Sequence, residues 1–200
     1  MKTLCMDSAH KHLVIALIED GQIKAACEKE CWKRQSETLF PELINCFQSA
    51  GWSVDDIDEA VISDGPGSYT GVRIAMSVAK VLCSSKNIPL SCISTLQLYA
   101  GLSEHAYVLL DARSKRAYFA HYHLGKLIGD EIVTTLDEIT NIISDHPYRV
   151  IGDTELLHCE KENVSLAENF CALLPFARKI DNIHSLTPRY LKDNDAYKVK

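Results

Sequence analysis

A glycine-rich segment is the first place where this chain could do chemistry. Residues 65–71 read Gly-Pro-Gly-Ser-Tyr-Thr-Gly, between a predicted strand and a predicted helix. Their spacing matches neither the dinucleotide-binding pattern G-x-G-x-x-G nor the phosphate-binding pattern G-x-x-x-x-G-K-[ST], because Val72 and not a lysine follows the last glycine. We therefore predict a rigid joint between strand and helix, whose helical end attracts anions only weakly.

Each residue type in this joint has a structural reason. The glycines allow a turn tight enough to reverse the chain, and Pro66 stiffens that turn. Ser68 or Thr70 can accept hydrogen bonds from the first free amides of the helix. The residues that we assign to this loop and helix cap are Gly65, Pro66, Gly67, Ser68, Thr70, Gly71 and Arg73.

Other candidate chemical groups give weaker signals. His10 and His12, like His121 and His123, would share one face of a strand and could chelate a metal, but such pairs more often serve packing. Ser68 could be the nucleophile of a peptidase, yet there is no G-x-S-x-G motif and no base nearby in the sequence. We assign no catalytic residue and no metal ligand.

Two aspartates stand at the starts of similar turns. These turns read Asp7-Ser8-Ala9-His10-Lys11 and Asp111-Ala112-Arg113-Ser114-Lys115. Both acids could hold a metal through water, so an independent ATP-dependent kinase or hydrolase is the alternative function. Neither turn contains glycine, however, and the bulky Arg113 stands where an approaching phosphate favours small residues. We favour acids that stabilise their own turns.

Composition narrows the class of protein. Hydrophobic residues make up 46% and charged residues 24% of the 200, as in ordinary soluble chains. The net charge of −6 disfavours a free-standing nucleic-acid binder. No apolar run approaches the roughly 20 residues of a membrane span, and the first residues are typical of a strand. The eight cysteines include no C-x-x-C pair and lie mostly in apolar runs, which indicates reduced thiols and a cytoplasmic location.

The elements that must position the glycine loop follow one order twice. In the first half we predict strands at 2–7, 12–19, 22–28, 59–63 and 90–93, with helices at 36–50, 70–86 and 95–101. In the second half we predict strands at 107–111, 116–124, 127–134 and 148–152, a helix at 136–145 and further helical segments to about 178.

An offset of 104 residues relates the two halves. It places Asp7 on Asp111, Lys11 on Lys115, Ala16 on Ala120 and the hairpin glycine Gly21 on Gly125. The pattern predicts a duplicated β-β-β-α-β-α unit and an α/β fold with two lobes, 1–103 and 104–200. This is the plan of the actin/Hsp70/sugar-kinase (ASKHA, ribonuclease H-like) superfamily, whose nucleotide lies between the lobes.

The helices at 36–50 and 70–86 are apolar over more than one face. A helix that lies on a sheet needs only one apolar face, so a second one predicts a further covering. Either the two helices cover each other within one molecule, or they form an exposed pair that binds another subunit. We expect the second, with interface residues Leu39, Leu43, Phe47, Ile74, Val78, Val81 and Leu82.

At this point the chain resembles the TsaB (YeaZ) family. The resemblance runs along most of the chain and is highly specific in 60–111, which includes the run from Ser63 to Ile74. Further matches are Asp7-Ser8, Gln35-Ser36-Glu37, Ala79-Lys80, Ile88-Pro89-Leu90, Ser94-Thr95-Leu96, Asp111-Ala112-Arg113 and Pro188-Arg189-Tyr190-Leu191.

The resemblance implies a function and a set of partners. TsaB proteins are non-catalytic subunits of the bacterial machinery for tRNA threonylcarbamoyladenosine (t6A). The implied partners are a TsaD-like transferase, bound through the first two long helices, and a TsaE-like ATPase. A homodimer through the same helices is implied when the protein is alone. tRNA would be contacted only through the complex. No cofactor is implied, apart from a weak or shared nucleotide at a subunit boundary.

Overall fold

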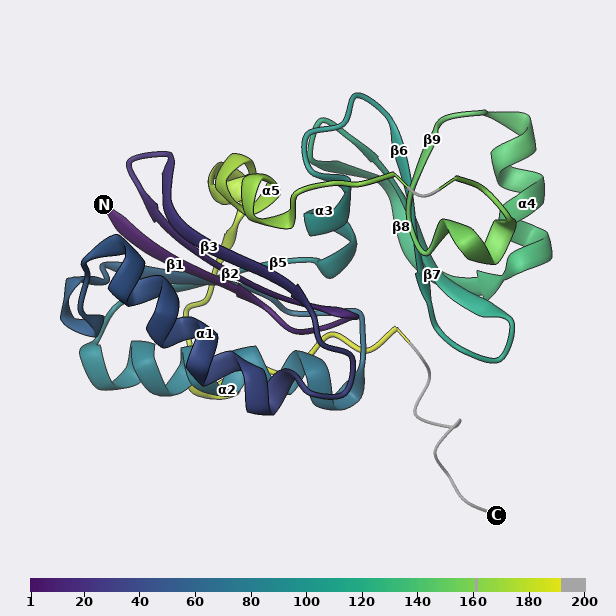
Figure 1. Cartoon of the computed structure of the whole chain (residues 1–200). Helices are drawn as coiled ribbons and strands as arrows, with labels where there is room; N and C mark the ends of the chain where they lie inside the picture. The colour runs from purple at the N-terminus through teal and green to yellow at the C-terminus, as the bar shows by residue number, and fades with distance from the viewer. Residues whose placement is uncertain (161, 192–200) are drawn as a thin grey trace, which may run out of the picture.

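The first sheet contains strands from both ends of the described chain. A computed structural model describes residues 1–160 and 162–191 (Figure 1). The strands of this sheet run in the order β10-β5-β4-β1-β2-β3, with β1, β4 and β5 parallel. Their bounds are β1 (Lys2–Asp7), β2 (His12–Glu19), β3 (Gln22–Glu30), β4 (Glu59–Ser63), β5 (Leu90–Ile93) and β10 (Arg178–Lys179).

The second sheet is smaller, and its first three strands repeat the order of the first three strands of the first sheet. Its order is β8-β7-β6-β9, built from β6 (Ala106–Asp111), β7 (Arg116–His123), β8 (Lys126–Thr135) and β9 (Arg149–Gly152). Three of its strands begin 104 residues after their counterparts in the first sheet, at Ala106, Arg116 and Lys126. The predicted duplication and the α/β fold of the ASKHA type are therefore confirmed.

Helices cover the outer faces and fill the space between the sheets. In Figure 1, α1 (Gln35–Ala50) and α2 (Tyr69–Lys86) lie together on one face of the first sheet. The other face carries α3 (Thr95–Ala100) and α5 (Leu166–Leu173), whereas α4 (Leu136–Asp145) covers the second sheet. Short 3-10 turns are η1 (Val54–Asp56), η2 (Thr154–Leu157), η3 (Leu174–Phe176) and η4 (Ile183–Ser185).

Strand β2 shows why the first sheet needs helices on both sides. Leu13, Ile15 and Leu17 contribute to the core beneath α1 and α2, whereas Val14 and Ala16 contribute to the core between the sheets. Successive side chains of a strand point to opposite faces, so a continuous apolar run requires cover on both faces. This apolar run is what the sequence presents at 13–18.

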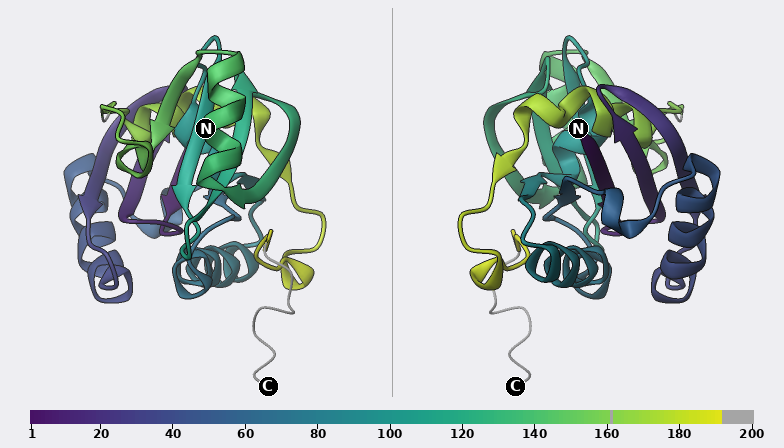
Figure 2. Two further views of the ribbon diagram at one scale, coloured as in Figure 1. Left: turned by 90° about the vertical axis from the view of Figure 1, so that its right-hand side faces the viewer. Right: turned by 90° about the vertical axis from the view of Figure 1, so that its left-hand side faces the viewer.

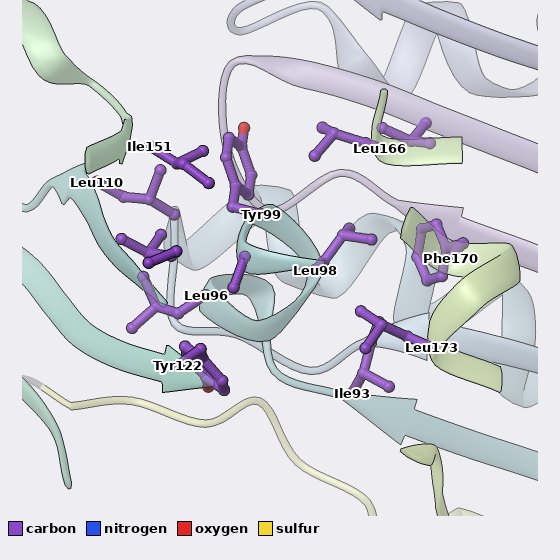
Figure 3. Packing of buried hydrophobic residues seen from close by; sticks show 14 of the residues in the cluster. Ile93, Leu96, Leu98, Tyr99, Leu110, Tyr122, Ile151, Leu166, Phe170 and Leu173 are labelled. Atoms are coloured by element: carbon purple, nitrogen blue, oxygen red, sulfur yellow. The ribbon is translucent and has the colours of Figure 1, made fainter. Parts of the chain in front are cut away.

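The short helix α3 is the centre of the core between the two sheets. Figure 3 shows Leu96, Leu98 and Tyr99 of α3 among side chains from several other elements. These neighbours are Ile93, Leu110, Tyr122 and Ile151 from the strands, with Leu166, Phe170 and Leu173 from α5. The two lobes thus share one apolar core.

Most predicted elements match the structure within two residues. The helix predicted at 136–145 and the strands at 59–63 and 90–93 have the predicted bounds. Strand β10 was not predicted: it lies where the sequence indicated helical segments, and it pairs with β5 of the first sheet. The division into lobes 1–103 and 104–200 stays a prediction. No helix within the described residues has the length and apolarity to cross a membrane.

The shared core makes a prediction about stability. Leu98 is fully buried, so Leu98→Ala should lower the free energy of unfolding by about 3 kcal/mol through lost contacts and a residual cavity. The same change at Leu127, which is 41% exposed on β8, should cost less than about 1 kcal/mol. Urea denaturation measures both values, and equal losses would contradict the assignment of α3 to the core.

Candidate functional site

The glycine loop packs directly on the first hairpin turn. A Cβ atom at Gly67 would lie 2.4 Å from the carbonyl oxygen of Ala9, and one at Gly71 would lie 2.3 Å from that of Ser8. The Ser68 amide donates to the Ala9 carbonyl at 2.8 Å. These glycines therefore allow two backbone segments to touch. The loop uses this close approach to contact protein, where a phosphate cradle would use it to contact an anion.

Two serines fix the start of α2 relative to the same turn. The Ser8 hydroxyl donates to the Gly71 carbonyl at 2.6 Å and accepts from the Ala75 amide at 3.1 Å. Ser68 is the N-cap of α2, and its side chain accepts from the Gly71 amide at 3.3 Å. Thr70 lies in the first turn of the helix. The loop, the hairpin turn and the helix form one rigid unit.

The peptide bond between Gly65 and Pro66 is cis, and this end of the loop contacts the C-terminal segment. The φ angle of Gly65 is +110°, and a Cβ atom there would lie 2.6 Å from the Arg189 carbonyl oxygen. The Arg189 amide donates to the Asp64 carbonyl at 2.7 Å. Gly65 therefore permits the late segment of the chain to pack on the loop.

A buried carboxylate joins the two lobes across the cleft. Asp153, which follows β9, accepts from His10 Nε2 at 2.8 Å, Lys11 Nζ at 2.7 Å and the Asp111 amide at 2.7 Å. We call these groups the Asp153 cluster. Burial alone would raise the pKa of Asp153, but the hydrogen bonds and charges of His10 and Lys11 outweigh it and hold that pKa well below the usual range. The carboxylate stays ionised.

The lysine of the first turn, Lys11, is already engaged in this cluster. Lys11 also donates to Glu155 at 2.8 Å. Burial opposes its charge, yet the two carboxylates raise the pKa of Lys11 to about 12. A phosphate entering the cleft would have to displace these carboxylates before it could pair with Lys11. No sequence pattern pointed to Asp153, which lies 142 residues from Lys11.

The two aspartates predicted as possible metal ligands occupy different environments. Asp7 is fully buried, where Oδ1 accepts from the Ala9 amide at 3.0 Å and from the Ser63 hydroxyl, and burial raises its pKa. Asp111 is exposed and accepts from the Arg113 amide at 2.7 Å. Each acid thus stabilises its own turn. In the described part of the chain, no three His, Cys, Asp or Glu side chains form a group suited to a metal.

The predicted histidine pair on β7 lies in a larger aromatic group. His105 Nδ1 and His121 Nε2 are 3.0 Å apart, and the rings of His105 and His123 are 4.3 Å apart. Tyr148 stacks on His105 at 4.5 Å. Burial, followed by the neighbouring histidines, lowers the pKa of His121. This group packs aromatic rings against one another. The sequence pattern had found two of its members.

The cleft beside the glycine loop contains two adjacent cavities, of about 310 and 260 Å³. Trp32, Ser68, Thr70 and Arg113 line both. His10 lines the second, so the fold brings a histidine near Ser68, which the sequence did not indicate. Among the described contacts, however, His10 pairs with Asp153 and Ser68 with Gly71, and no hydrogen bond joins the two. Ser68 therefore lacks the paired base of an activated nucleophile.

The C-terminal segment forms a second set of polar contacts between the lobes. Arg189 pairs with the buried Asp64 at 3.2 Å and with Glu131 of the second sheet at 2.9 Å. Arg178 of β10 also pairs with Asp64, at 2.9 Å. The Tyr122 hydroxyl donates to Glu131 at 2.5 Å. The predicted tail motif thus holds the two sheets together.

The same segment covers one flank of α2. Tyr190 stacks on Tyr69 with 5.5 Å between ring centroids, and its hydroxyl accepts from Arg73 Nε at 3.0 Å. Lys80 donates to the carbonyl oxygens of His184 and Leu186 at 3.0 Å. Figure 2 shows this segment beside α2. Arg73, assigned in the sequence to the loop, therefore fastens the tail to the first turns of α2.

The outer face of α1 and α2 exposes large apolar side chains. Phe40 is 57%, Ile44 56% and Val81 70% exposed. The residues predicted for this interface differ in how exposed they are to solvent. Val81 is exposed, Leu43, Ile74, Val78 and Leu82 are half-buried, and Leu39 and Phe47 lie in the protein's own core. Leu39 and Phe47 thus support α1 from beneath, whereas Phe40 and Ile44, which the sequence prediction omitted, face outward.

Comparison with known proteins gives consistent matches. The family model for tRNA N6-adenosine threonylcarbamoyltransferase, TsaD, matches residues 29–169. The tRNA threonylcarbamoyladenosine biosynthesis protein TsaB of Bacillus subtilis is 27% identical over 216 aligned positions, covering 96% of this chain and 94% of that protein. TsaB of Escherichia coli is 30% identical over 128 positions, covering 61% and 55%.

Solved structures match the fold over nearly the whole chain. YeaZ from Pseudomonas aeruginosa superposes with a TM-score of 0.75 at 20% identity, covering 95% of this chain and 99% of that one. A second structure from the same organism, of an uncharacterized protein with similarity to peptidase YeaZ, gives 0.79 at 22% identity, covering 96% and 99%.

The contact between loop and hairpin turn predicts the effect of a single methyl group. Gly67→Ala should lower the free energy of unfolding by about 3 kcal/mol, because the new Cβ meets the Ala9 backbone, which cannot easily move. Gly129→Ala is the control: nothing lies within 4 Å, so only its left-handed φ of +75° costs about 1 kcal/mol. Chemical denaturation measures both, and a harmless Gly67→Ala would refute the proposed reason for glycine.

The Asp153 cluster predicts a pH-dependent stability. Asp153→Asn should lower the free energy of unfolding near neutral pH by about 2 to 3 kcal/mol, since it removes the carboxylate partner of the buried His10 and leaves Lys11 with Glu155 alone. A lowered carboxyl pKa stabilises the fold fully above about pH 4 and loses that contribution as the pH falls further. The difference from wild type should therefore shrink below about pH 4.

Urea titrations of both proteins at several pH values test this expectation. The control is Asp20→Asn, which removes a surface pair with the N-terminal amine and should leave stability close to wild type. A difference that grows as the solution is acidified would contradict the assignment of Asp153 as an ionised, buried anion.

Proposed function

Because the chain belongs to the tRNA N6-adenosine threonylcarbamoyltransferase (TsaD) family and, within it, to the TsaB (YeaZ) proteins, we propose that it is a non-catalytic subunit of t6A biosynthesis that binds and supports a TsaD-like transferase. Involvement in the t6A pathway rests on the relatives named TsaB. The subunit role rests on the physical properties of this chain. Its surface chemistry suits protein binding better than catalysis.

The exposed apolar face of α1 and α2 carries the proposal. Phe40, Ile44 and Val81 lie exposed on two neighbouring helices, both of which pack on the same face of one sheet (Figure 1). Large exposed apolar side chains gathered on one face are typical of binding surfaces. Because Leu39 and Phe47 anchor α1 to the core, this face can bind without rearrangement of the fold.

The cleft supports the non-catalytic part of the proposal. Two side chains of the first hairpin turn, His10 and Lys11, already pair with Asp153, and Ser68 serves as a helix cap. Neither the phosphate-binding groups of a kinase nor the nucleophile and base of a peptidase are thus free to act. In this account the second lobe stabilises the first, and the first presents its helices to the partner.

Further partners follow from the same proposal. A TsaE-like ATPase would join the pair, and tRNA would be contacted only through the assembled complex, in keeping with the net charge of −6. Alone, the chain would form a homodimer through α1 and α2, because an apolar face without its partner favours self-association. We also propose a cytoplasmic location, where tRNA modification occurs and the eight free cysteines stay reduced.

Charge placed on the helical face tests the proposal. Ile44→Glu and Val81→Glu should each weaken binding of the TsaD-like protein of the same organism by about 100-fold, because a carboxylate would be buried in an apolar contact. Thermal unfolding should change little, since both side chains are exposed. Co-purification and titration calorimetry measure the affinity.

A matched control distinguishes this face from exposed apolar residues in general. Ile128, 47% exposed on β8, lies on the second sheet, so Ile128→Glu should leave the affinity unchanged. The proposal fails if wild type and transferase migrate separately at micromolar concentration, or if the glutamates on α1 and α2 have no more effect than the one on β8.

The alternative of an independent ATP-dependent enzyme has one supporting observation. Oδ2 of the buried Asp7 has no hydrogen-bond partner among the described residues, as a metal-binding carboxylate could. Calorimetry of the isolated chain with Mg-ATP decides between the two readings. We expect no saturable heat and no phosphate release. Tight binding with turnover, abolished by Asp7→Asn, would replace the proposal.

A further inference from the structure

An acidic cavity of about 220 Å³ lies between the lobes, on the side of the Asp153 cluster where β3 and the start of α5 meet. It is separate from the helical face proposed for the partner. One lysine, Lys11, lines it. The carboxylates around it are those of Glu28, Glu30, Asp153, Glu155 and Glu162. This excess of negative charge gives the cavity a strong preference for positively charged ligands.

Tyr99 contributes a hydroxyl that has no partner. The residue is 6% exposed and lines the cavity, yet its hydroxyl oxygen makes no hydrogen bond within the described part of the chain. In Figure 3 this oxygen points into the space between Ile151 and Leu166. Leu166 also lines the cavity, as does Gly152, the residue after Ile151. Buried hydroxyls almost always have a hydrogen-bond partner, so the Tyr99 hydroxyl is available to bond a molecule that enters the cavity.

The surroundings determine which form of the hydroxyl a ligand would meet. Burial, together with the negative charges of Asp7, Asp153, Glu28 and Glu30, raises the pKa of Tyr99 well above its ordinary value. The phenol therefore stays neutral and can accept a hydrogen bond from a cation. Its edge-on contact with His10, at 6.1 Å between ring centroids, helps to hold the ring in place.

The carboxylates around the cavity differ in whether they already have hydrogen-bond or ion-pair partners. Glu28 is held by α5, where it accepts from the Ser165 hydroxyl at 2.6 Å and from the amides of Leu166 and Ala167 at 3.0 and 2.8 Å. Glu155 pairs with Lys11. The Glu30 side chain forms no hydrogen bond or ion pair with the described residues, so its carboxylate is the one best able to bind a new cation.

We propose that this cavity binds a small organic cation of the polyamine class, with one ammonium group donating to the Tyr99 hydroxyl and the Glu30 carboxylate. The fixed negative charge of Glu28 adds a longer-range attraction. An organic cation fits better than a metal ion, because among the described residues no three acidic, histidine or cysteine side chains are close enough to hold one. The volume also suits a chain of several carbon and nitrogen atoms.

Calorimetry of the full chain with spermidine as the probe tests this site. We expect saturable binding with one ligand per chain. Tyr99→Phe should weaken it about tenfold, because it removes a hydrogen bond to a charged group, and Glu30→Gln should do so by at least as much. Without spermidine, the thermal midpoint of Tyr99→Phe should equal or exceed that of wild type, since only an unpaired hydroxyl is lost.

Glu37→Gln is the matched control, because it removes one exposed carboxylate of α1 that does not line the cavity and should leave spermidine affinity unchanged. Several results would overturn the site. The first is the absence of saturable binding. The second is equal spermidine affinity in all three variants, as expected for diffuse attraction to an acidic surface. The third is that Mg²⁺ alone binds equally tightly, with the same dependence on Tyr99 and Glu30. Glu30→Gln changes an exposed side chain, so the test holds even if Tyr99→Phe folds poorly.

Discussion

The close contact between the glycine loop and the first hairpin turn is the constraint on which the rest of this structure depends. Gly67 and Gly71 bring the loop within van der Waals distance of the Ala9 and Ser8 carbonyls, and Ser8 and Ser68 then set the start of α2. Any side chain at either glycine would push the helix away from the sheet. A motif that looks like a phosphate cradle is therefore used to hold α2, and with it the outward apolar face.

Ion pairs and hydrogen bonds span the cleft between the two lobes. Asp153 engages both His10 and Lys11 of the first turn, and Arg189 joins Asp64 of one lobe to Glu131 of the other. Buried pairs of this kind add little net stability but strongly penalise the loss of one partner. They fix the relative position of the lobes, which suits a subunit whose binding surface must keep one shape.

The sequence predicted the helices and strands better than the contacts between side chains that are distant along the chain. Apolar runs and turn residues located nearly every strand, and the offset of 104 residues revealed the duplication, because these signals are local or periodic. Asp153, Arg189 and Tyr99 act through partners that are distant along the chain, and no spacing rule reveals such partners. The helical pattern of α1 likewise showed two apolar faces but not which one meets the sheet, so Leu39 and Phe47 were predicted outward although they are buried.

The central claim is that the chain acts by binding a transferase through the outer face of α1 and α2. Hydrogen–deuterium exchange of the full chain, with and without the TsaD-like protein of the same organism, tests it most directly. We expect new protection of backbone amides confined to α1 and α2, with the hairpin turn at 8–11 and the segment around Asp153 unchanged. Protection concentrated at that turn and at Asp153, with the two helices unaffected, would contradict it.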